Sequence, residues 1–312
     1  MISVSVKNIS KLYGAVKAVD DVSFDVQKGE LFGLIGPDGA GKTSLFRILT
    51  TLLLADHGTA SVNGLDVVKD YRAIRNKIGY MPGRFSLYQD LTVNENLSFF
   101  AAIFGTSIEE NYALIRDIYE QIKPFGNRRA GKLSGGMKQK LALCCALIHK
   151  PEVLFLDEPT TGVDVVSRKE FWEMLARLKE QQITIVVSTP YMDEARRCDR
   201  IALMQAGKIM SVETPERIIH NFPKPVYAVG ATDLYGLLKE LRVDPAVESC
   251  YAFGQYLHLT VLAATTSEQS IHSIVQKYQP KNLVIKEITP TIEDSFIRLM
   301  NEQNANAEND GE

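Results

Sequence analysis

The stretch "LFGLIGPDGAGKTSLFRILTTLL", residues 31–53, decides the fold of this chain. Its first part, "LFGLIG" (31–36), is a short apolar run bounded by glycine, which predicts a buried strand. Its last part, "KTSLFRILTTLL" (42–53), predicts a helix. The loop between them, "GPDGAGKTS" (36–44), matches G-x-x-x-x-G-K-[ST] in the strand–loop–helix context that gives this pattern its meaning. The sequence therefore predicts a phosphate-binding loop with a nucleoside triphosphate as its ligand.

The side chains of this loop suit a triphosphate. Glycines let the backbone turn successive N–H groups toward an anion, and the following helix adds its positive N-terminus. Lys42 can reach the outer phosphates, and the Thr43 hydroxyl can bind Mg²⁺. A second stretch, "VLFLDEP" (153–159), predicts a buried strand that ends in two carboxylates. There Asp157 can hold Mg²⁺, usually through water, and Glu158 can orient or deprotonate an attacking water.

The alternation of strands and helices around these motifs indicates the fold class. Short apolar runs at 78–81 and 184–188 predict further buried strands. Helical periodicity recurs in four longer segments, residues 93–104, 109–122, 134–149 and 167–180. Strands that alternate with helices at this pace favour a three-layer α/β domain with a largely parallel sheet.

The composition changes near residue 222, where "NFPKPVYAV" carries two prolines and predicts a linker. Beyond it, residues 226–301 follow the order strand, helix, strand, strand, helix, strand, helix. That order is typical of a small α+β, ferredoxin-like module. We therefore expect a first domain over 1–222 and a second over 226–301. The polar, acidic tail at 302–312 is predicted to be disordered.

Composition excludes several classes of protein. The chain has 312 residues, 45% of them hydrophobic, so a large core can form. Its formal net charge of -3 gives no electrostatic reason to expect nucleic acid as a partner. No apolar run is long enough to span a bilayer, and the N-terminus lacks the features of a signal peptide. The four cysteines show no metal or disulfide pattern, which favours reduced thiols in the cytosol.

The stretch "LSGGMKQKLALCCAL" (133–147) identifies the family. Ser134, Gly135 and Gly136 open a helix, so exposed N–H groups and a hydroxyl form a second anion site away from the phosphate loop. A P-loop kinase has no use for such a site. Over residues 1–220 the chain resembles the ATP-binding cassette family, in which signatures of the LSGGQ type cap the γ-phosphate bound by the opposite subunit. The resemblance implies antiparallel strands at the N-terminus and a helical subdomain at about 84–150.

The resemblance also implies roles for individual residues. Tyr13 in "KLYG" matches the aromatic residue that stacks on adenine, and Asp164 in "TTGVD" matches the loop that crosses the dimer interface. Asp157 and Glu158 match the magnesium and catalytic carboxylates, with Thr43 as the second metal ligand. The remaining ATP-binding positions match the phosphate loop and the signature: Gly36, Pro37, Asp38, Gly39, Ala40, Gly41, Lys42, Thr43, Ser44, Ser134, Gly135 and Gly136.

The C-terminal module carries a resemblance of its own. Cassettes of drug, antibiotic and polysaccharide exporters often end in a helix of the form P-[ST]-x-E-D-x-F-[IL], and "PTIEDSFIRLM" (290–300) fits that form. The resemblance implies export through a membrane-spanning permease on a separate chain. It also implies a second cassette, identical or different, and a cytoplasmic location at the inner face of the membrane.

Three positions depart from the family pattern. Asp38 replaces the usual Asn of the phosphate loop, Gly83 follows Pro82 where the family has Gln, and Pro190 follows the strand where the family has the switch His. Gln89 lies six residues beyond Gly83 in the same loop, which is too far to substitute for the missing amide. The alternative is another loop conformation that brings in Gln89 or a water. Because one preorganised transition-state contact commonly contributes about 10² to 10³ in rate, we expect ATP binding with weak hydrolysis at this site.

A second interpretation stays open, namely a soluble cassette protein that acts on ribosomes or DNA. Ribosome-acting members typically join two cassettes through a basic linker, and the DNA-repair type inserts long coiled coils. This chain has one phosphate loop, a formal net charge of -3 and no heptad array, which favours the exporter. The sequence indicates neither the transported substrate nor the partner cassette.

Overall fold

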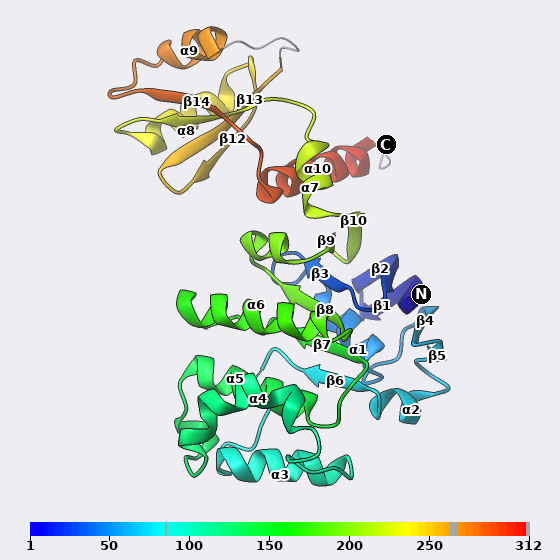
Figure 1. Cartoon of the computed structure of the whole chain (residues 1–312). Helices are drawn as coiled ribbons and strands as arrows, with labels where there is room; N and C mark the ends of the chain where they lie inside the picture. Colours follow the sequence, from blue (N-terminus) through cyan, green and yellow to red (C-terminus); the bar gives the residue numbers. More distant parts are fainter. Residues whose placement is uncertain (85, 263–267, 310–312) are drawn as a thin grey trace. The chain divides into compact units, whose positions relative to one another are not determined.

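The computed structural model describes the chain except residues 85, 263–267 and 310–312 (Figure 1). It divides into two compact units, Met1–Pro215 and Glu216–Glu312. In the described residues, no helix combines the length and the apolar character that a bilayer crossing requires.

The centre of the first unit is a six-stranded sheet in the order β10-β9-β3-β8-β7-β6. Its strands are β3 (Leu31–Ile35), β6 (Ile78–Met81), β7 (Val153–Asp157), β8 (Thr184–Thr189), β9 (Arg200–Gln205) and β10 (Lys208–Glu213). All neighbours pair in parallel except β10, which is antiparallel to β9. Every residue of β3, β7 and β8 is buried, which explains their continuous apolar sequences.

A second sheet of the first unit is antiparallel, in the order β2-β1-β4-β5. Its strands are β1 (Ile2–Tyr13), β2 (Val16–Gln27), β4 (His57–Val62) and β5 (Leu65–Asp66). One core joins both sheets around the helix that follows the phosphate loop. Within it the rings of Phe24 and Phe32 stack with centroids 5.2 Å apart. The expected antiparallel N-terminal strands are therefore present beside the parallel sheet.

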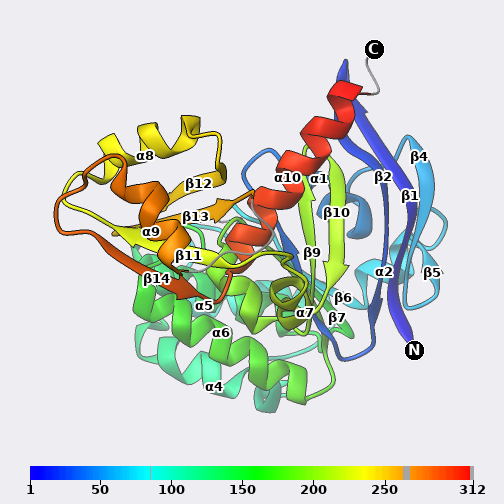
Figure 2. The ribbon, with the colours of Figure 1, turned by 90° about the horizontal axis from the view of Figure 1, so that it is seen from above.

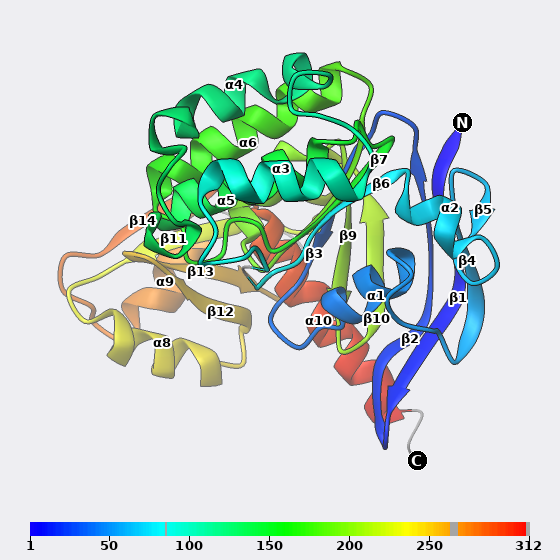
Figure 3. The same ribbon diagram turned by 90° about the horizontal axis from the view of Figure 1, so that it is seen from below.

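Helices complete the first unit: α1 (Lys42–Leu49), α2 (Tyr71–Arg75), α3 (Val93–Ile103), α4 (Tyr112–Ile122), α5 (Gly135–Leu147) and α6 (Val165–Glu180). Figure 3 shows α3, α4 and α5 gathered together, away from α1 and the antiparallel sheet. The first helix ends at Leu49 although apolar periodicity continues to residue 53. It ends there because Thr51 adopts the left-handed conformation, with φ 64.

The second unit has a four-stranded antiparallel sheet in the order β12-β13-β11-β14 (Figure 2). Its strands are β11 (Val226–Gly230), β12 (Val247–Phe253), β13 (Tyr256–Val261) and β14 (Val284–Ile288). Its helices are α7 (Pro215–His220, whose first residue closes the first unit), α8 (Leu234–Val243), α9 (Glu268–Gln276) and α10 (Ile292–Asn309). Apolar residues of α8 and α9 share one core with the sheet. The predicted ferredoxin-like order is confirmed, with α10 as an added helix.

Two boundaries differ from the sequence prediction. The division between the units precedes most of α7 instead of following it. Ser295 of α10 donates a hydrogen bond to the Ile218 carbonyl of α7 at 3.3 Å. In the segment 302–312, which we predicted to be disordered, α10 continues to Asn309. Alanine, glutamate and glutamine in this segment have good helix propensity, which polarity alone does not reveal. The last three residues lie outside the described residues.

Candidate functional site

The phosphate loop connects β3 to α1 and depends on glycine at two close approaches. A β-carbon at Gly36 would lie 2.1 Å from the Met204 carbonyl oxygen. A β-carbon at Gly41 would lie 2.0 Å from the Ala18 carbonyl oxygen, and Gly41 has a φ of +104. Any larger residue at either position would displace the loop. The tip at Asp38 is exposed, as an anion-binding loop requires.

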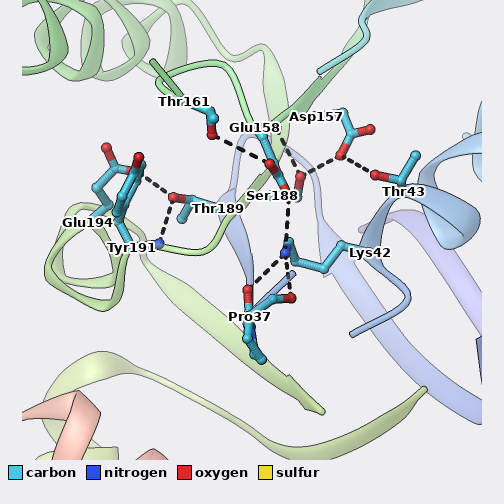
Figure 4. A network of polar contacts seen from close by, with 11 residues as sticks. Pro37, Lys42, Thr43, Asp157, Glu158, Thr161, Ser188, Thr189, Tyr191 and Glu194 are labelled. Carbon is cyan, nitrogen blue, oxygen red and sulfur yellow. Dashed lines mark hydrogen bonds and ion pairs between the residues drawn. The ribbon is translucent and has the colours of Figure 1, made fainter. Parts of the chain in front are cut away.

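Lys42 is held inside this loop (Figure 4). Its Nζ donates to the carbonyl oxygens of Gly36 at 2.8 Å and Pro37 at 3.0 Å. The same ammonium lies 3.1 Å from Oε1 of Glu158, with 3% of the lysine side chain exposed and 20% of the glutamate side chain. The cation predicted to face phosphate and the carboxylate predicted to act on water are thus in contact.

Asp157 lies at the end of β7 with two hydroxyl groups against it. The hydroxyls of Thr43 and Ser188 donate to its Oδ1 at 3.2 Å and 2.7 Å. A buried carboxylate beside a threonine hydroxyl is a set of hard oxygen ligands that fits Mg²⁺. Burial and the nearby Asp157 charge also raise the pKa of Tyr80 to about 12, so this tyrosine stays neutral beside the carboxylate.

The backbone of Glu158 is unusual, because this residue has a φ of 51 in the left-handed region. Its N–H donates to both the carbonyl and the hydroxyl oxygen of Ser188, at 3.1 and 3.0 Å. These bonds hold the turn that directs the carboxylate back to Lys42, while the Thr161 hydroxyl donates to Oε2 at 3.4 Å. Such conformations persist where neighbouring structure fixes them, and they are common at functional sites.

The predicted adenine contact lies at the same loop. The Ser44 hydroxyl, in the first turn of α1, donates to the Tyr13 hydroxyl at 3.5 Å. Tyr13 comes from the end of β1 and is exposed, with Lys11 Nζ 5.9 Å from its ring centroid. The structure therefore places an aromatic ring beside the phosphate loop, where it is accessible to a base.

The signature lies at the exposed start of α5. Ser134 caps this helix, and its hydroxyl accepts the Met137 N–H at 3.4 Å. A β-carbon at Gly136 would lie 2.7 Å from the Ser167 hydroxyl, so glycine lets the start of α5 approach the start of α6. Gly135 and Ser134 stay exposed, with the helix N-terminus available to an anion from outside the unit.

The loop before α6 presents apolar side chains beside the signature. Asp164 caps α6, and hydrogen bonds from Ser167 hold the pKa of its carboxyl below the usual value. Val165 and Val166 follow it with 75% and 68% of their surface exposed. Two neighbouring exposed valines are unusual for a helix start, and they offer an apolar contact next to the signature.

Two positions that should carry polar groups lie at the site without them. A β-carbon at Gly83 would lie 3.0 Å from the Asp157 carbonyl oxygen and 3.8 Å from Asp157 Oδ2, so this position adjoins the metal carboxylate. Pro190 follows Thr189, whose carbonyl accepts the Gly36 N–H at 3.3 Å, so this position adjoins the phosphate loop. Neither the glycine nor the proline supplies a hydrogen-bonding side chain at these two positions.

Gln89 does not approach the carboxylate in this conformation. Its carbonyl oxygen accepts the Gly131 N–H at 2.9 Å. A β-carbon built on Gly131 would lie 3.7 Å from Gln89 Oε1, so the amide side chain also lies beside Gly131. Gln89 therefore belongs to the helical region in front of the signature.

Sequence reasoning missed Glu194, which lies in a 3₁₀ helix, Met192–Arg197. This buried carboxylate accepts from the hydroxyls of Thr189 at 2.5 Å and Thr160 at 3.0 Å. Arg168 Nε lies 3.7 Å from its other oxygen. Glu194 thus ties the strand before Pro190 to the loop after Glu158. A lone glutamate in a charged segment gave no sequence signal for this.

An apolar cavity of about 420 Å³ adjoins Gly83. It lies between β6 and the helices α3 and α5, and its walls include Met81, Pro82, Phe100 and Ile103. Because Pro82 lies in its wall and Gly83 lies against Asp157, the cavity and the carboxylate share one short segment of chain.

Fold and site together are those of a P-loop nucleoside triphosphatase. Residues 19–161 match the family described as ABC transporter. The probable multidrug ABC transporter ATP-binding protein YbhF of Escherichia coli K12 is 41% identical over 68% of this chain, which spans 37% of that protein. The Nod factor export ATP-binding protein I of Rhizobium sp. strain N33 is 32% identical over 96% of this chain and 97% of its own length.

Solved structures agree with these relatives. An ATP-binding subunit of an ABC transporter matches with a TM-score of 0.64 and 28% identity, covering 70% of this chain and 93% of that one. The cassette MJ0796, dimeric and bound to ADP and Pi, matches with a TM-score of 0.62 and 26% identity, covering 68% and 98%. The chain belongs to the ATP-binding cassette family and is similar to the ATP-binding subunits of exporters.

Proposed function

We propose that this chain is the ATP-binding subunit of an export system that drives a membrane permease on a separate chain. The exporter names of YbhF and the Nod factor protein support this proposal, as does the ending "PTIEDSFIRLM". The multidrug relative favours efflux of drug-like or antibiotic-like compounds. The chain would then work in the cytoplasm at the inner face of the membrane.

The geometry supports a role for each site residue. Residues 36–44 would hold the phosphates, with Lys42 as the buried cation, and Tyr13 would stack on adenine. Thr43 and Asp157 would hold Mg²⁺, which when bound neutralises charge on the phosphates. Glu158 would accept a proton from the attacking water or orient it. The contacts that support these roles are those of Lys42 with the loop carbonyls and of Thr43 with Asp157.

Two residues support the further proposal of slow hydrolysis, namely Gly83 and Pro190, whose side chains cannot form hydrogen bonds. Both positions adjoin the site, at Asp157 and at Gly36, yet neither supplies a hydrogen-bonding side chain. Each missing preorganised contact commonly contributes about 10² to 10³ in rate. The chain should therefore bind ATP and hydrolyse it slowly at its own phosphate loop, although Glu158 is present.

The signature favours a partner cassette that differs from this chain. Ser134 and Gly135 are exposed and unaltered, and Val165 and Val166 next to them need a covering surface. A cassette with an intact switch would gain a complete site from this signature. The dimeric solved cassette supports such pairing in the family. We therefore assign this chain the role of completing its partner's site.

The permease would dock at the 420 Å³ cavity. This cavity is apolar, it opens to the surface, and it is joined through Pro82 to Gly83 and Asp157. A helix of the membrane subunit seated there would move the segment that adjoins the metal carboxylate. Residues 226–301 would form an accessory module that nucleotide binding does not require.

ATP binding and turnover of the purified chain test the proposal together. A fluorescent ATP analogue should bind to the wild-type chain and bind weakly to Lys42→Ala. Turnover by the chain alone should be slow at every concentration, including those at which it could pair with itself. Rapid turnover by the isolated chain would contradict the slow site, and failure to bind nucleotide would contradict the site assignment itself.

A further inference from the structure

The second unit contains a cavity of about 300 Å³ between one face of its sheet and α10. The sheet contributes two cross-strand pairs on one face, Ser249 opposite Thr260 and Tyr251 opposite His258. The residues between them point to the other face and join the core of α8 and α9. The cavity therefore lies on the side of the sheet that these two helices leave uncovered.

The opposite wall is one stripe of α10. Asp294, Ile297, Arg298 and Asn301 line the cavity, and their spacing of three and four residues places them on one helix face. Phe222 and Pro223 close one end. Every lining residue belongs to Glu216–Glu312, so the cavity is separate from the nucleotide site.

Most polar groups of this cavity have partners among the described residues. The Ser249 and Thr260 hydroxyls are 2.7 Å apart, and Asn301 donates to the Tyr251 hydroxyl at 2.9 Å. The other polar groups form two close pairs, each of a basic and an acidic residue. Lys224 lies 2.6 Å from Glu248, and His258 lies 2.8 Å from Asp294 Oδ1.

One donor is an exception. Arg298 Nε is buried, and in the described part of the chain it has no hydrogen-bond partner. The guanidinium donates through Nη1 to Glu302 at 2.5 Å and lies 5.9 Å from the centroid of the Phe222 ring. A buried donor without an acceptor is unfavourable, and Arg298, whose side chain is 32% exposed, gains by turning its guanidinium toward a ligand oxygen in the cavity.

The hydrogen-bond acceptors that line the cavity already have partners, and this favours a ligand with a negative charge. Asp294 accepts from His258 through Oδ1 and from the N–H and hydroxyl of Thr291 through Oδ2. Glu248 and Glu302 each pair with a basic side chain of the cavity, Lys224 and Arg298. The Arg298–Glu302 pair is partly exposed, and such pairs are weak enough for a ligand carboxylate to compete.

We propose that this cavity binds a small planar organic acid. The aromatic body would lie between Phe222 and Ile297, and its carboxylate would accept from the guanidinium of Arg298. The volume is at the small end of the range for ligand pockets, about 300 to 1,000 Å³, and suits a molecule of two fused rings. This inference does not rest on the proposed transport function.

The test uses the full chain and two probes with the same ring system, 2-naphthoate and 2-naphthylmethylammonium, titrated by calorimetry. Arg298→Met removes the donor but retains the bulk, and Ser249→Phe fills the cavity without removing charge. Lys239→Met is the matched control, because Lys239 Nζ also lies over an aromatic ring, that of Tyr235 at 4.3 Å, but outside the cavity.

We expect 2-naphthoate to bind at least about tenfold more tightly than the cation, because the free group is a charged donor. Arg298→Met should weaken the binding of 2-naphthoate by about tenfold or more. Ser249→Phe should abolish this binding, and Lys239→Met should leave it unchanged. Arg298→Lys, which lacks Nε at this position, replaces the methionine variant if that one does not fold. Equal binding by wild type, Arg298→Met and Ser249→Phe would overturn the assignment. No binding of 2-naphthoate at about 1 mM would overturn it too.

Discussion

Lys42 Nζ lies 3.1 Å from Glu158 Oε1, so the side chain that we propose to bind phosphate forms an ion pair with the carboxylate that we propose to act on water. Two backbone carbonyls complete the contacts of the ammonium. A phosphate that enters the loop must compete with Glu158 for this cation. In the function that we propose, nucleotide binding would release this carboxylate beside the outer phosphate.

This contact gives opposite expectations for its two partners. Lys42→Ala should weaken ATP binding by about 1.5 to 3 kcal/mol, the usual contribution of a hydrogen bond to a charged group. Glu158→Gln should leave binding equal or tighter, because it removes the competing charge. Titration with a fluorescent ATP analogue measures both, and Lys77→Ala, an exposed ion-paired lysine elsewhere, is the control. Unchanged affinity in Lys42→Ala would refute the assignment of this cation.

Restoring the two missing groups should accelerate the slow site. Gly83→Gln with Pro190→His should raise turnover by the isolated chain about tenfold or more, since each such contact commonly contributes about 10² to 10³. The increase in turnover is limited because a β-carbon at position 83 would lie 3.0 Å from the Asp157 carbonyl oxygen, so the chain must shift slightly to accept it. The control is Gly83→Ala with Pro190→Ala, which changes both positions without adding a hydrogen-bonding group. If both pairs change turnover equally, the missing side chains are not the cause.

Those parts of the fold that depend on local patterns of buried apolar residues could be predicted from the sequence. The bounds of β6 and β7 agree with the predicted runs at 78–81 and 153–157, because each is a short and mostly apolar stretch. The helix end at Leu49 was not predictable from periodicity, because it depends on the backbone of Thr51.

The residues of the site could be predicted only where they belong to a sequence motif. Lys42 and Asp157 stand in recognisable patterns, so their residues could be named from the sequence. The Lys42–Glu158 contact and the burial of Glu194 depend on how distant segments pack, and no spacing in the sequence encodes them. Gln89 shows the same limit, because only the structure places it beside Gly131.

Stability of the second unit should depend on pH through Asp294. Burial alone would raise the pKa of this carboxyl, but hydrogen bonds from His258 and Thr291 outweigh it and hold the pKa below 3.8. The carboxylate therefore stabilises the fold above its unfolded pKa, and this contribution is lost as the pH falls through the lower folded value.

Asp294→Asn should accordingly lower the free energy of unfolding at neutral pH by about 1 to 3 kcal/mol, because His258 and Thr291 lose a charged acceptor. The difference from wild type should shrink as the pH falls below 3.8. Denaturant unfolding at several pH values measures it, with Asp233→Asn, the cap of α8, as the comparison. A difference that stays constant down to strongly acidic pH would contradict the charge-based explanation.

The proposed docking of the permease predicts that one exposed side chain is essential for assembly. Ile103 lines the 420 Å³ cavity and has 59% of its surface exposed. Ile103→Glu should place a charge in the apolar contact and prevent co-purification with the membrane subunit, while ATP binding by the chain alone stays intact. Val68→Glu, at another exposed apolar position, should have no effect. Normal assembly of Ile103→Glu would exclude this docking surface.

The asymmetry of the assembled transporter tests the central claim most directly. Two variants of this chain are compared by the ATPase rate of the complex purified with its membrane subunit and partner cassette. Ser134→Arg blocks the anion site at the start of α5, which we assign to the partner's γ-phosphate, and Glu158→Gln disables the chain's own site. Our proposal predicts that Ser134→Arg abolishes most of the activity and that Glu158→Gln costs little. Equal losses from the two substitutions would contradict it.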